Sequence, residues 1–217
     1  MKLYTYFRSS AAFRTRIALN LKGIPYESIP VDLRAAAAAQ RTPEFLAVNP
    51  QGLVPALEHD GRTITQSLAI IEYLDETHPQ PPFLPTSPAD RAQVRALALA
   101  IACDIHPLNN LRVLNYLRAP LGHDEDSVNS WYRHWIGTGF TALEEQVRRT
   151  SGDGRHMFGR TITLADIFIV PQMYNARRFN CDLEPYPTLR AICASLESLP
   201  AFAKATPEAQ PDAARSP

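Results

Sequence analysis

The sequence predicts a small domain with a mixed β-sheet, followed by an all-helical domain. Two observations carry this prediction. Short segments with strand-like patterns lie in the first 65 residues, whereas the apolar positions after residue 87 repeat with helical spacing. Five prolines between residues 79 and 88 separate the two parts, and proline neither continues a helix nor donates to a sheet. The chain of 217 residues is long enough for one or two domains with a real core.

The first domain begins with a strand, a helix and a second strand. We expect a short strand at Leu3–Tyr6 and a second strand at residues 26–31. Between them, Phe13, Ile17 and Leu21 recur at every fourth position, as on one face of a helix. Because a helix separates the two strands, we expect them to pair in parallel.

The rest of this domain is expected to contain a hairpin and a helix, together with one segment whose structure stays open. Residues 35–39 are a run of alanines that favours helix, but Arg41-Thr42-Pro43 interrupts it, so its structure stays open. Residues 55–58 and 62–65 flank Asp60-Gly61, a pair typical of a tight hairpin turn. Ser67 is expected to cap a helix that runs to Leu74.

The second domain is predicted to be helical throughout. Ser87 and Pro88 have the residue types of an N-cap and a first helical position, and Pro107 is expected to kink the helix that follows them. Thr163-Leu-Ala-Asp166 matches a capping box, so Asp166 is assigned to the cap rather than to catalysis. The further helices are expected at residues 127–149, about 163–179 and 188–199.

The expected domain boundaries follow from these elements. Residues 1–80 form the sheet domain, 81–86 the linker and 87–217 the helical domain. Trp131, Trp135 and Phe140 are spaced for a buried helical face. The tail from Thr206 has three prolines and no apolar period, so we expect it to be mobile.

Composition narrows the class of protein. Lys and Arg together number 22, as do Asp and Glu, so the net charge gives no reason to expect a nucleic acid or an anionic membrane as partner. The apolar stretches are too short for a membrane span, and no secretory signal is expected at the N-terminus. The three cysteines are scattered, with no spacing typical of a metal site, so we expect no metal and a reducing cytoplasm.

Several polar residues stand where helix ends are predicted. Ser9 and Ser10 precede the first helix, whose N-terminus can hold an anion or keep a thiol ionised, although Ser10 alone would be an ordinary cap. Gln66-Ser67 begins another helix and suits either a carboxylate ligand or a plain cap. His106, Asn109 and Asn110 cluster beside Pro107, while Arg177-Arg178 ends a helix, where surface cations are common.

In addition, the chain resembles the zeta class of glutathione transferases, which includes maleylacetoacetate and maleylpyruvate isomerases. The resemblance covers nearly the whole length, and its motifs occur in the family's order. They are Ser9-Ser10-Ala11-Ala12-Phe13-Arg14-Thr15-Arg16-Ile17-Ala18-Leu19, Asn49-Pro50-Gln51-Gly52-Leu53-Val54-Pro55, Gln66-Ser67-Leu68-Ala69-Ile70-Ile71-Glu72-Tyr73-Leu74, Asp104-Ile105-His106-Pro107-Leu108-Asn109-Asn110 and Asp182-Leu183-Glu184-Pro185-Tyr186-Pro187.

The resemblance implies a thioredoxin-like α/β domain, an all-α C-terminal domain, a homodimer and glutathione as cofactor. It implies a cis peptide bond at Val54-Pro55 and a catalytic set of Ser9, Ser10 and Arg178. Arg8 and Arg178 are the implied contacts to a substrate carboxylate. The implied glutathione contacts, some of them across a subunit interface, are Ser9, Ser10, Gln40, Val54, Pro55, Gln66, Ser67, His106, Asn109 and Asn110.

The activity implied is a glutathione-dependent cis–trans isomerisation of maleylacetoacetate-type dicarboxylates in aromatic catabolism. A thiolate adds to the double bond, the resulting single bond rotates, and elimination restores the thiol. Three alternatives remain: a maleylpyruvate isomerase, a glutathione transferase acting on electrophiles such as haloacids, and a non-enzymatic glutathione-binding module. One departure from the family concerns the rate of isomerisation: Ala11 stands where the family usually has cysteine. The protein should be slower if that cysteine assists addition or proton transfer, and nothing is lost if the two serines suffice.

Overall fold

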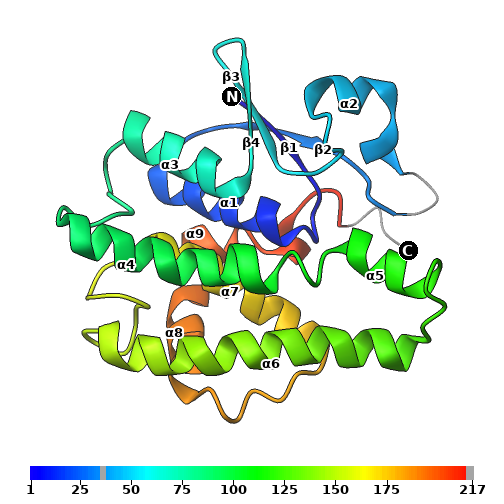
Figure 1. The fold of residues 1–217 in the computed structure, drawn as a ribbon. Coiled ribbons are helices and arrows are strands. Elements are labelled where there is room, and N and C mark those ends of the chain that lie inside the picture. Colours follow the sequence, from blue (N-terminus) through cyan, green and yellow to red (C-terminus); the bar gives the residue numbers. More distant parts are fainter. Residues whose placement is uncertain (35–37, 214–217) are drawn as a thin grey trace. The chain divides into compact units, whose positions relative to one another are not determined.

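The computed structural model describes residues 1–34 and 38–213, and in it the chain forms two compact units. Unit 1 contains Met1–Pro82 together with the segment from Ser198 onward, and unit 2 is Phe83–Glu197. Unit 1 holds the mixed sheet and unit 2 is helical (Figure 1), which confirms the expected architecture. The expected helical domain, residues 87–217, differs from unit 2 at its C-terminal end, because the segment from Ser198 onward belongs to unit 1 with the sheet.

The sheet of unit 1 has four strands in the order β2-β1-β3-β4. β1 (Lys2–Thr5) pairs in parallel with β2 (Glu27–Pro30), as predicted from the helix between them. β1 also pairs antiparallel with β3 (Ala56–His59), which forms the predicted hairpin with β4 (Arg62–Thr65). Asp60 and Gly61 at the turn have φ of 49° and 72°, the left-handed values that a tight hairpin requires.

Helices cover the sheet of unit 1. α1 (Ser10–Lys22) and α3 (Ser67–Thr77) pack together on one face, and α9 (Pro200–Ala203) packs against α1 (Figure 1). α2 (Pro43–Val48) follows the short 3₁₀ helix η1 (Ala39–Arg41). The alanine run mostly falls outside the described residues, since the structure describes only Ala38 and Ala39 of that stretch.

The two faces of β1 pack against different elements, because side chains alternate along a strand. Leu3 and Thr5 are buried, and the Thr5 hydroxyl accepts a hydrogen bond from Arg16 of α1. The ring of Tyr4 points the other way and packs against Phe45 of α2, with ring centroids 5.9 Å apart. The end of β1 is therefore held between α1 and α2, and the chain leaves it directly into the loop that precedes α1.

Unit 2 is built around a buried central helix. α7 (Leu164–Arg178) packs against α4 (Pro88–Leu99) and α8 (Pro187–Glu197), and most of its side chains are buried. The long helix α6 (Glu125–Thr150) packs against α8, α5 (Leu111–Arg118) and the π-helix η2 (Ala100–Ile105). A Cβ on Gly139 of α6 would lie 2.3 Å from the Ile105 side chain, so glycine permits this close approach.

Two helical expectations need correction, the kink at Pro107 and the buried aromatic face. Pro107 does not kink a continuous helix: α4 passes into the π-helix, which ends at Ile105, and α5 starts at Leu111 after a turn. The predicted helix 188–199 is confirmed as α8, and the short helix α9 follows it after Ser198 and Leu199. Of the aromatic face, Phe140 is fully buried while Trp131 and Trp135 are only partly so. The Ser87 cap is confirmed, because its hydroxyl accepts a bond from the Asp90 N–H.

The tail from Thr206 is packed as far as residue 213, contrary to the expected mobility. Pro207 and Gln210 are buried; Pro207 begins the short 3₁₀ helix η3 (Pro207–Ala209), and Gln210 follows it. The Gln210 amide donates to the backbone oxygens of Lys204 and Thr206, both at 2.9 Å. Side-chain-to-backbone bonds thus hold a segment that lacks the apolar period by which sequence patterns reveal packing.

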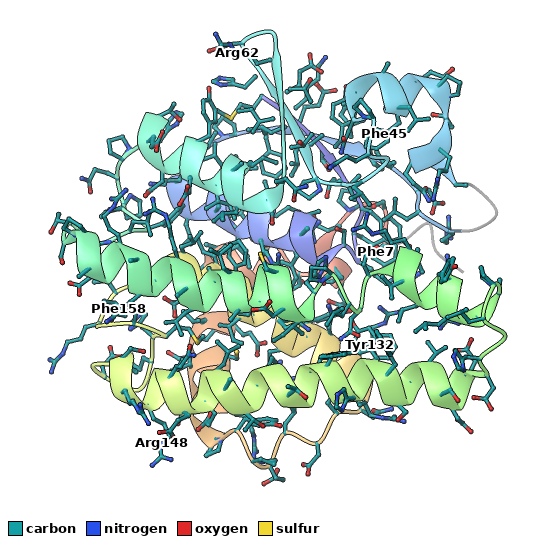
Figure 2. All side chains as sticks on the ribbon, in the orientation of Figure 1. Phe7, Phe45, Arg62, Tyr132, Arg148 and Phe158 are labelled. Atoms are coloured by element: carbon teal, nitrogen blue, oxygen red, sulfur yellow. The ribbon has the colours of Figure 1, made fainter. Side chains whose placement is uncertain are left out.

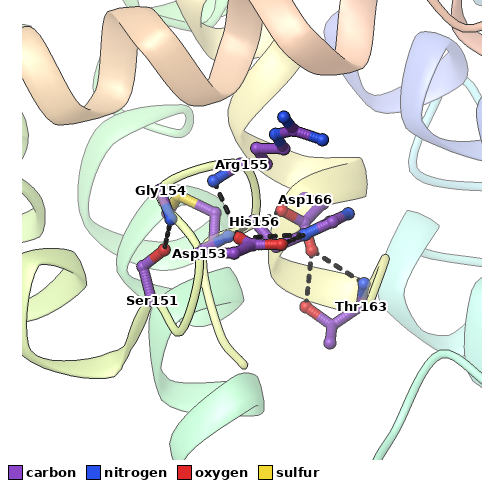
Figure 3. Close-up of polar contacts among 8 residues, drawn as sticks. Ser151, Asp153, Gly154, Arg155, His156, Thr163 and Asp166 are labelled. Atoms are coloured by element: carbon purple, nitrogen blue, oxygen red, sulfur yellow. Dashed lines mark hydrogen bonds and ion pairs between the residues drawn. The ribbon is translucent and has the colours of Figure 1, made fainter. Parts of the chain in front are cut away.

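Asp166 forms the predicted capping box at the start of α7 (Figure 3). Its carboxylate accepts bonds from the Thr163 N–H at 2.7 Å, the Thr163 hydroxyl at 2.8 Å and the Met157 N–H at 2.7 Å. Complete burial raises the pKa of Asp166 to about 6, against the opposing effect of these donors. Asp166 therefore ties the loop before α7 to the helix that forms the core of unit 2.

Replacing Asp166 by alanine should lower the free energy of unfolding by about 3 kcal/mol, because two buried backbone N–H groups would lose their acceptor. Chemical denaturation followed by circular dichroism measures this loss. Asp182→Ala is the control, since Asp182 accepts a local bond from the Glu184 N–H and lies at the surface. Equal losses in the two variants would contradict a central role for the Asp166 cap.

Candidate functional site

The loop before α1 presents the Ser9 hydroxyl at the N-terminus of that helix. Ser9, not Ser10, is the N-cap: its Oγ accepts a bond from the Ala12 N–H at 3.2 Å. Within the described residues no acceptor engages the proton of the Ser9 hydroxyl, so it is available to a ligand. Ser10 is the first helical residue and is buried, with 6% of its surface exposed. The reading of Ser10 as the ordinary cap is therefore wrong.

The electrostatics at this point favour an anion. The N–H groups of the first turn of α1 have no intrahelical partners, and the helix dipole is positive there. The first turn, which is described completely, carries no acidic side chain. A thiolate placed beside the Ser9 hydroxyl would meet a donor and a positive field.

Arg8 stands next to Ser9 and is exposed. Its guanidinium donates to the Tyr6 hydroxyl at 3.1 Å and lies 5.0 Å from the centroid of the Phe7 ring. These contacts hold the side chain at the loop while its charge stays accessible. Arg8 is thus suitably placed to bind a carboxylate near the start of α1.

A buried arginine, which the sequence analysis did not single out, holds the loop from inside. Arg16 donates to the backbone oxygens of Phe7 at 3.0 Å and Tyr6 at 3.4 Å, and to the Thr5 hydroxyl at 3.0 Å. Burial lowers its pKa to about 10, so it stays charged at neutral pH. The sequence did contain a signal for this buried residue: Arg16 comes three residues after Phe13 and so falls on the apolar face of the helix.

The second predicted segment is the turn that leads into β3. The Val54–Pro55 peptide bond is cis, as the resemblance implied. Asn49 shapes the turn, since its side-chain amide donates to the Leu53 oxygen at 2.7 Å. Gly52 has φ of 64°, and a Cβ there would lie 2.9 Å from the Gln40 backbone oxygen. The backbone of Gln40 therefore lies close to this turn.

The third segment is the start of α3. Gln66 is its N-cap and has φ of 69° and ψ of 119°, a conformation that is costly for a residue with a side chain. Its amide donates to the Gln51 side chain at 3.2 Å. Ser67, which was expected to be the cap, is instead the first residue of α3 and is buried. The strained Gln66 marks this turn as a candidate ligand contact.

Unit 1 brings these three segments together. Val54 packs in one buried cluster with Tyr6 and Phe7 of the loop before α1. Gln66 bonds to Gln51 of the turn, and the Ser67 hydroxyl accepts from Arg14 of α1 at 3.5 Å. The other members of the cluster are Val31 and Phe45, and Figure 2 labels Phe7 and Phe45.

In unit 2, the segment after the π-helix is fixed to α6. The Asn109 amide is buried and donates to the Tyr132 backbone oxygen at 3.2 Å, and the Trp131 indole donates to the Leu108 oxygen at 2.9 Å. Asn110 caps α5 by accepting from the Arg112 N–H at 3.1 Å. His106 ends the π-helix through a backbone bond. Asn109 and Asn110 therefore have structural roles that the sequence analysis did not foresee.

Arg177 and Arg178 at the end of α7 differ in their contacts. Arg177 forms an ion pair with Glu197 of α8 at 2.6 Å. The Arg178 guanidinium lies 5.2 Å from the centroid of the Phe179 ring, which stacks on Tyr132 with ring centroids 3.5 Å apart. Figure 2 labels Tyr132 on α6. Arg177 thus serves the packing of unit 2, and Arg178 is the better candidate for binding a substrate.

The cysteines lie outside all of these segments. Cys103 is exposed, Cys181 is partly buried and Cys193 is buried. Burial raises the pKa of Cys181 to about 11 and raises that of Cys193 as well. The described residues contain no cluster of histidine, cysteine or acidic side chains suited to a metal ion. No helix in the described ranges has the length and apolarity needed to cross a bilayer.

The sequence and the fold of this chain are both similar to those of known proteins. Residues 8–77 match the family model for the glutathione S-transferase N-terminal domain. A probable maleylacetoacetate isomerase from Vibrio cholerae serotype O1 is 54% identical over 211 residues, covering 97% of each chain. The chain belongs to the family of zeta-class glutathione transferases and maleylacetoacetate isomerases.

Two solved structures extend the comparison. The holo structure of a maleylpyruvate isomerase, a bacterial zeta-class glutathione S-transferase, superposes with a TM-score of 0.94 at 49% identity, covering 98% of this chain and 99% of that one. A maleylacetoacetate isomerase from Methylobacterium extorquens AM1, with malonate and glutathione bound, has a TM-score of 0.92 at 42% identity, covering 97% and 98%. The resemblance stated from the motifs is thus confirmed over the full length of the chain.

The thiols should differ in reactivity as their burial differs. Under native conditions near neutral pH, iodoacetamide should modify Cys103 first and Cys181 slowly, because alkylation requires the thiolate. Cys193 should react only after unfolding. Peptide mass spectrometry over time measures all three, and denatured protein is the control. Rapid native labelling of Cys193 would contradict the packing of α8.

Proposed function

We propose that this protein is a glutathione-dependent cis–trans isomerase of maleylacetoacetate-type dicarboxylates, acting in aromatic catabolism. The single observation that carries the proposal is the Ser9 hydroxyl, whose proton is available at the N-terminus of α1. The identity of 54% to a probable maleylacetoacetate isomerase supports the substrate class. Bound glutathione would supply a thiolate that adds reversibly to the cis double bond, so that the bond rotates before the thiolate leaves.

In this proposal, unit 1 binds glutathione and keeps its thiol ionised. Ser9 donates to the sulfur, and the N–H groups at Ser10 and the rest of the first turn add a positive field. The backbone at Val54, before the cis Pro55, pairs with the peptide backbone of glutathione. Gln66 and Ser67 receive a carboxylate at the start of α3, and Gln40 completes the contacts.

Unit 2 and Arg8 contribute the remaining roles. Arg178 binds a substrate carboxylate, and exposed Arg8 is the second cation for this purpose. His106, Asn109 and Asn110 are proposed as further glutathione contacts, partly across the interface of a homodimer. A cytoplasmic location is part of the proposal, since glutathione chemistry and three free cysteines suit a reducing compartment.

A specific observation favours one alternative substrate. The maleylpyruvate isomerase structure superposes with a TM-score of 0.94, and its substrate shares the reacting end of maleylacetoacetate. The test is turnover of maleylacetone and of maleylpyruvate with glutathione, followed by the loss of the cis alkene. The proposal expects glutathione-dependent isomerisation without consumption of glutathione. Conjugation of chloroacetate alone would indicate a transferase, and the absence of any turnover would indicate a binding module.

Ser9→Ala should lower turnover by about ten- to a hundredfold, because a hydrogen bond to a charged group contributes roughly 1.5–3 kcal/mol. Steady-state kinetics with maleylacetone measure this, and the pKa of the bound glutathione thiol should rise. Ser87→Ala is the matched control, since it removes an equivalent N-cap in unit 2. If Ser10→Ala caused the loss and Ser9→Ala did not, the roles of the two serines would be reversed.

Arg178→Ala should raise the KM for the dicarboxylate and leave glutathione affinity nearly unchanged, because a guanidinium binds a carboxylate through two parallel bonds. Arg178→Lys should recover part of the loss, since the charge remains and the planar group does not. Arg177→Ala is the control, because Arg177 pairs with Glu197. Slow conjugation of chlorodinitrobenzene should be unaffected by Arg178→Ala; equal losses on both substrates would assign Arg178 a structural role.

A further inference from the structure

The segment Ala205–Ala213 folds back onto the loop that carries Ser9 (Figure 1). Ala205 is fully buried, and its backbone oxygen accepts a bond from Arg16 Nε at 3.0 Å. The Gln210 amide bonds hold the chain compact between Lys204 and Gln210. Arg16 thus connects this segment to the loop before α1.

Both polar groups of the Phe7 backbone are hydrogen-bonded to side chains, one from α1 and one from the C-terminal segment. The Phe7 N–H donates to Asp212 Oδ2 at 2.9 Å, and the Phe7 carbonyl accepts from Arg16 Nη2 at 3.0 Å. The Ser9 N–H donates to the Tyr6 carbonyl at 2.9 Å, which closes the turn. The path of the backbone into Ser9 is therefore fixed by bonds to Asp212 and Arg16.

An apolar contact accompanies these bonds. Ala213 packs against the buried cluster that contains Tyr6, Phe7 and Val54. The same cluster also contains Val54, the residue before the cis proline, so the segment packs against a cluster shared by two of the three regions that the proposed function uses. This packing and the Asp212 bond are independent observations that lead to one place in unit 1.

We propose that Ala205–Ala213 is a positioning element for the thiol-activating loop, with Asp212 as its positioning residue. This inference rests on the proposed function, since it concerns where the Ser9 hydroxyl lies. A carboxylate that accepts from a backbone N–H makes a stronger bond than a neutral acceptor would. A displacement of the loop would move the Ser9 hydroxyl relative to a bound sulfur, and small misplacements at a reacting group reduce rates substantially.

The experiment compares two substitutions and two shortened chains with the wild type. Asp212→Ala removes the acceptor, and Asp212→Asn keeps an oxygen at that position without the charge. A chain ending at Gln210 lacks Asp212 and Ala213. A chain ending at Ala213 keeps both and is the matched control. The measurements are kcat and KM for maleylacetone, the pKa of the bound glutathione thiol from its ultraviolet absorbance, the rate of hydrogen exchange at the Phe7 amide, and the melting temperature.

We expect Asp212→Ala to lower kcat/KM by about three- to tenfold and to raise the thiol pKa, since the loop loses a charge-assisted bond. Asp212→Asn should recover part of this loss, because it keeps an acceptor without the charge, and the chain ending at Gln210 should lose at least as much as Asp212→Ala. The chain ending at Ala213 should match the wild type.

Three outcomes would overturn the inference. The first is a lower melting temperature in Asp212→Ala with kinetics and thiol pKa unchanged, which would make the segment a structural support only. The second is an equal loss in the chain ending at Ala213. The third is an unchanged rate of hydrogen exchange at the Phe7 amide in Asp212→Ala. Thiol pKa and amide exchange are measured without isomerisation, so failure of the proposed function would be seen separately, as absent turnover in the wild type.

Discussion

The buried guanidinium of Arg16 is the interaction on which the candidate site of unit 1 depends. It joins Thr5 at the end of β1, the loop carbonyls of Tyr6 and Phe7, and the Ala205 carbonyl of the C-terminal segment. A buried charge is costly unless it is hydrogen-bonded, and here three consecutive residues at the end of β1 and one residue near the C-terminus supply four acceptor oxygens. The loop cannot move without disturbing the sheet, α1 and the last segment together.

This anchoring explains how a short loop can present a reactive hydroxyl. Loops are usually more mobile than the elements that they connect. Here the turn is closed by its own backbone bond and held at Phe7 from two sides, so that Ser9 enters α1 as a defined N-cap. Preorganised donors stabilise a developing charge without the cost of reorganisation, which is the physical advantage of a fixed Ser9.

The two arginines at the end of α7 show how neighbouring residues of one type acquire different roles. Arg177 lies against α8 and pairs with Glu197, whereas Arg178 lies over Phe179, which stacks on Tyr132. Two adjacent arginines at a helix end gave no physical reason for this distinction, and only the family resemblance singled out Arg178. A cation held over an aromatic ring keeps its hydrogen-bonding edge available, so Arg178 remains open to a carboxylate.

The sequence by itself determined the elements that local chemistry specifies. The period of the apolar residues predicted α1, Asp60-Gly61 predicted the hairpin, and the Thr163–Asp166 capping box predicted the start of α7. The motifs predicted the family. Only the tertiary structure decided that Ser9 rather than Ser10 is the cap, that the helix ends before Pro107, and that the tail packs on the loop. These outcomes depend on Arg16, Tyr132 and Asp212 meeting partners distant in the sequence, and no local pattern encodes such contacts.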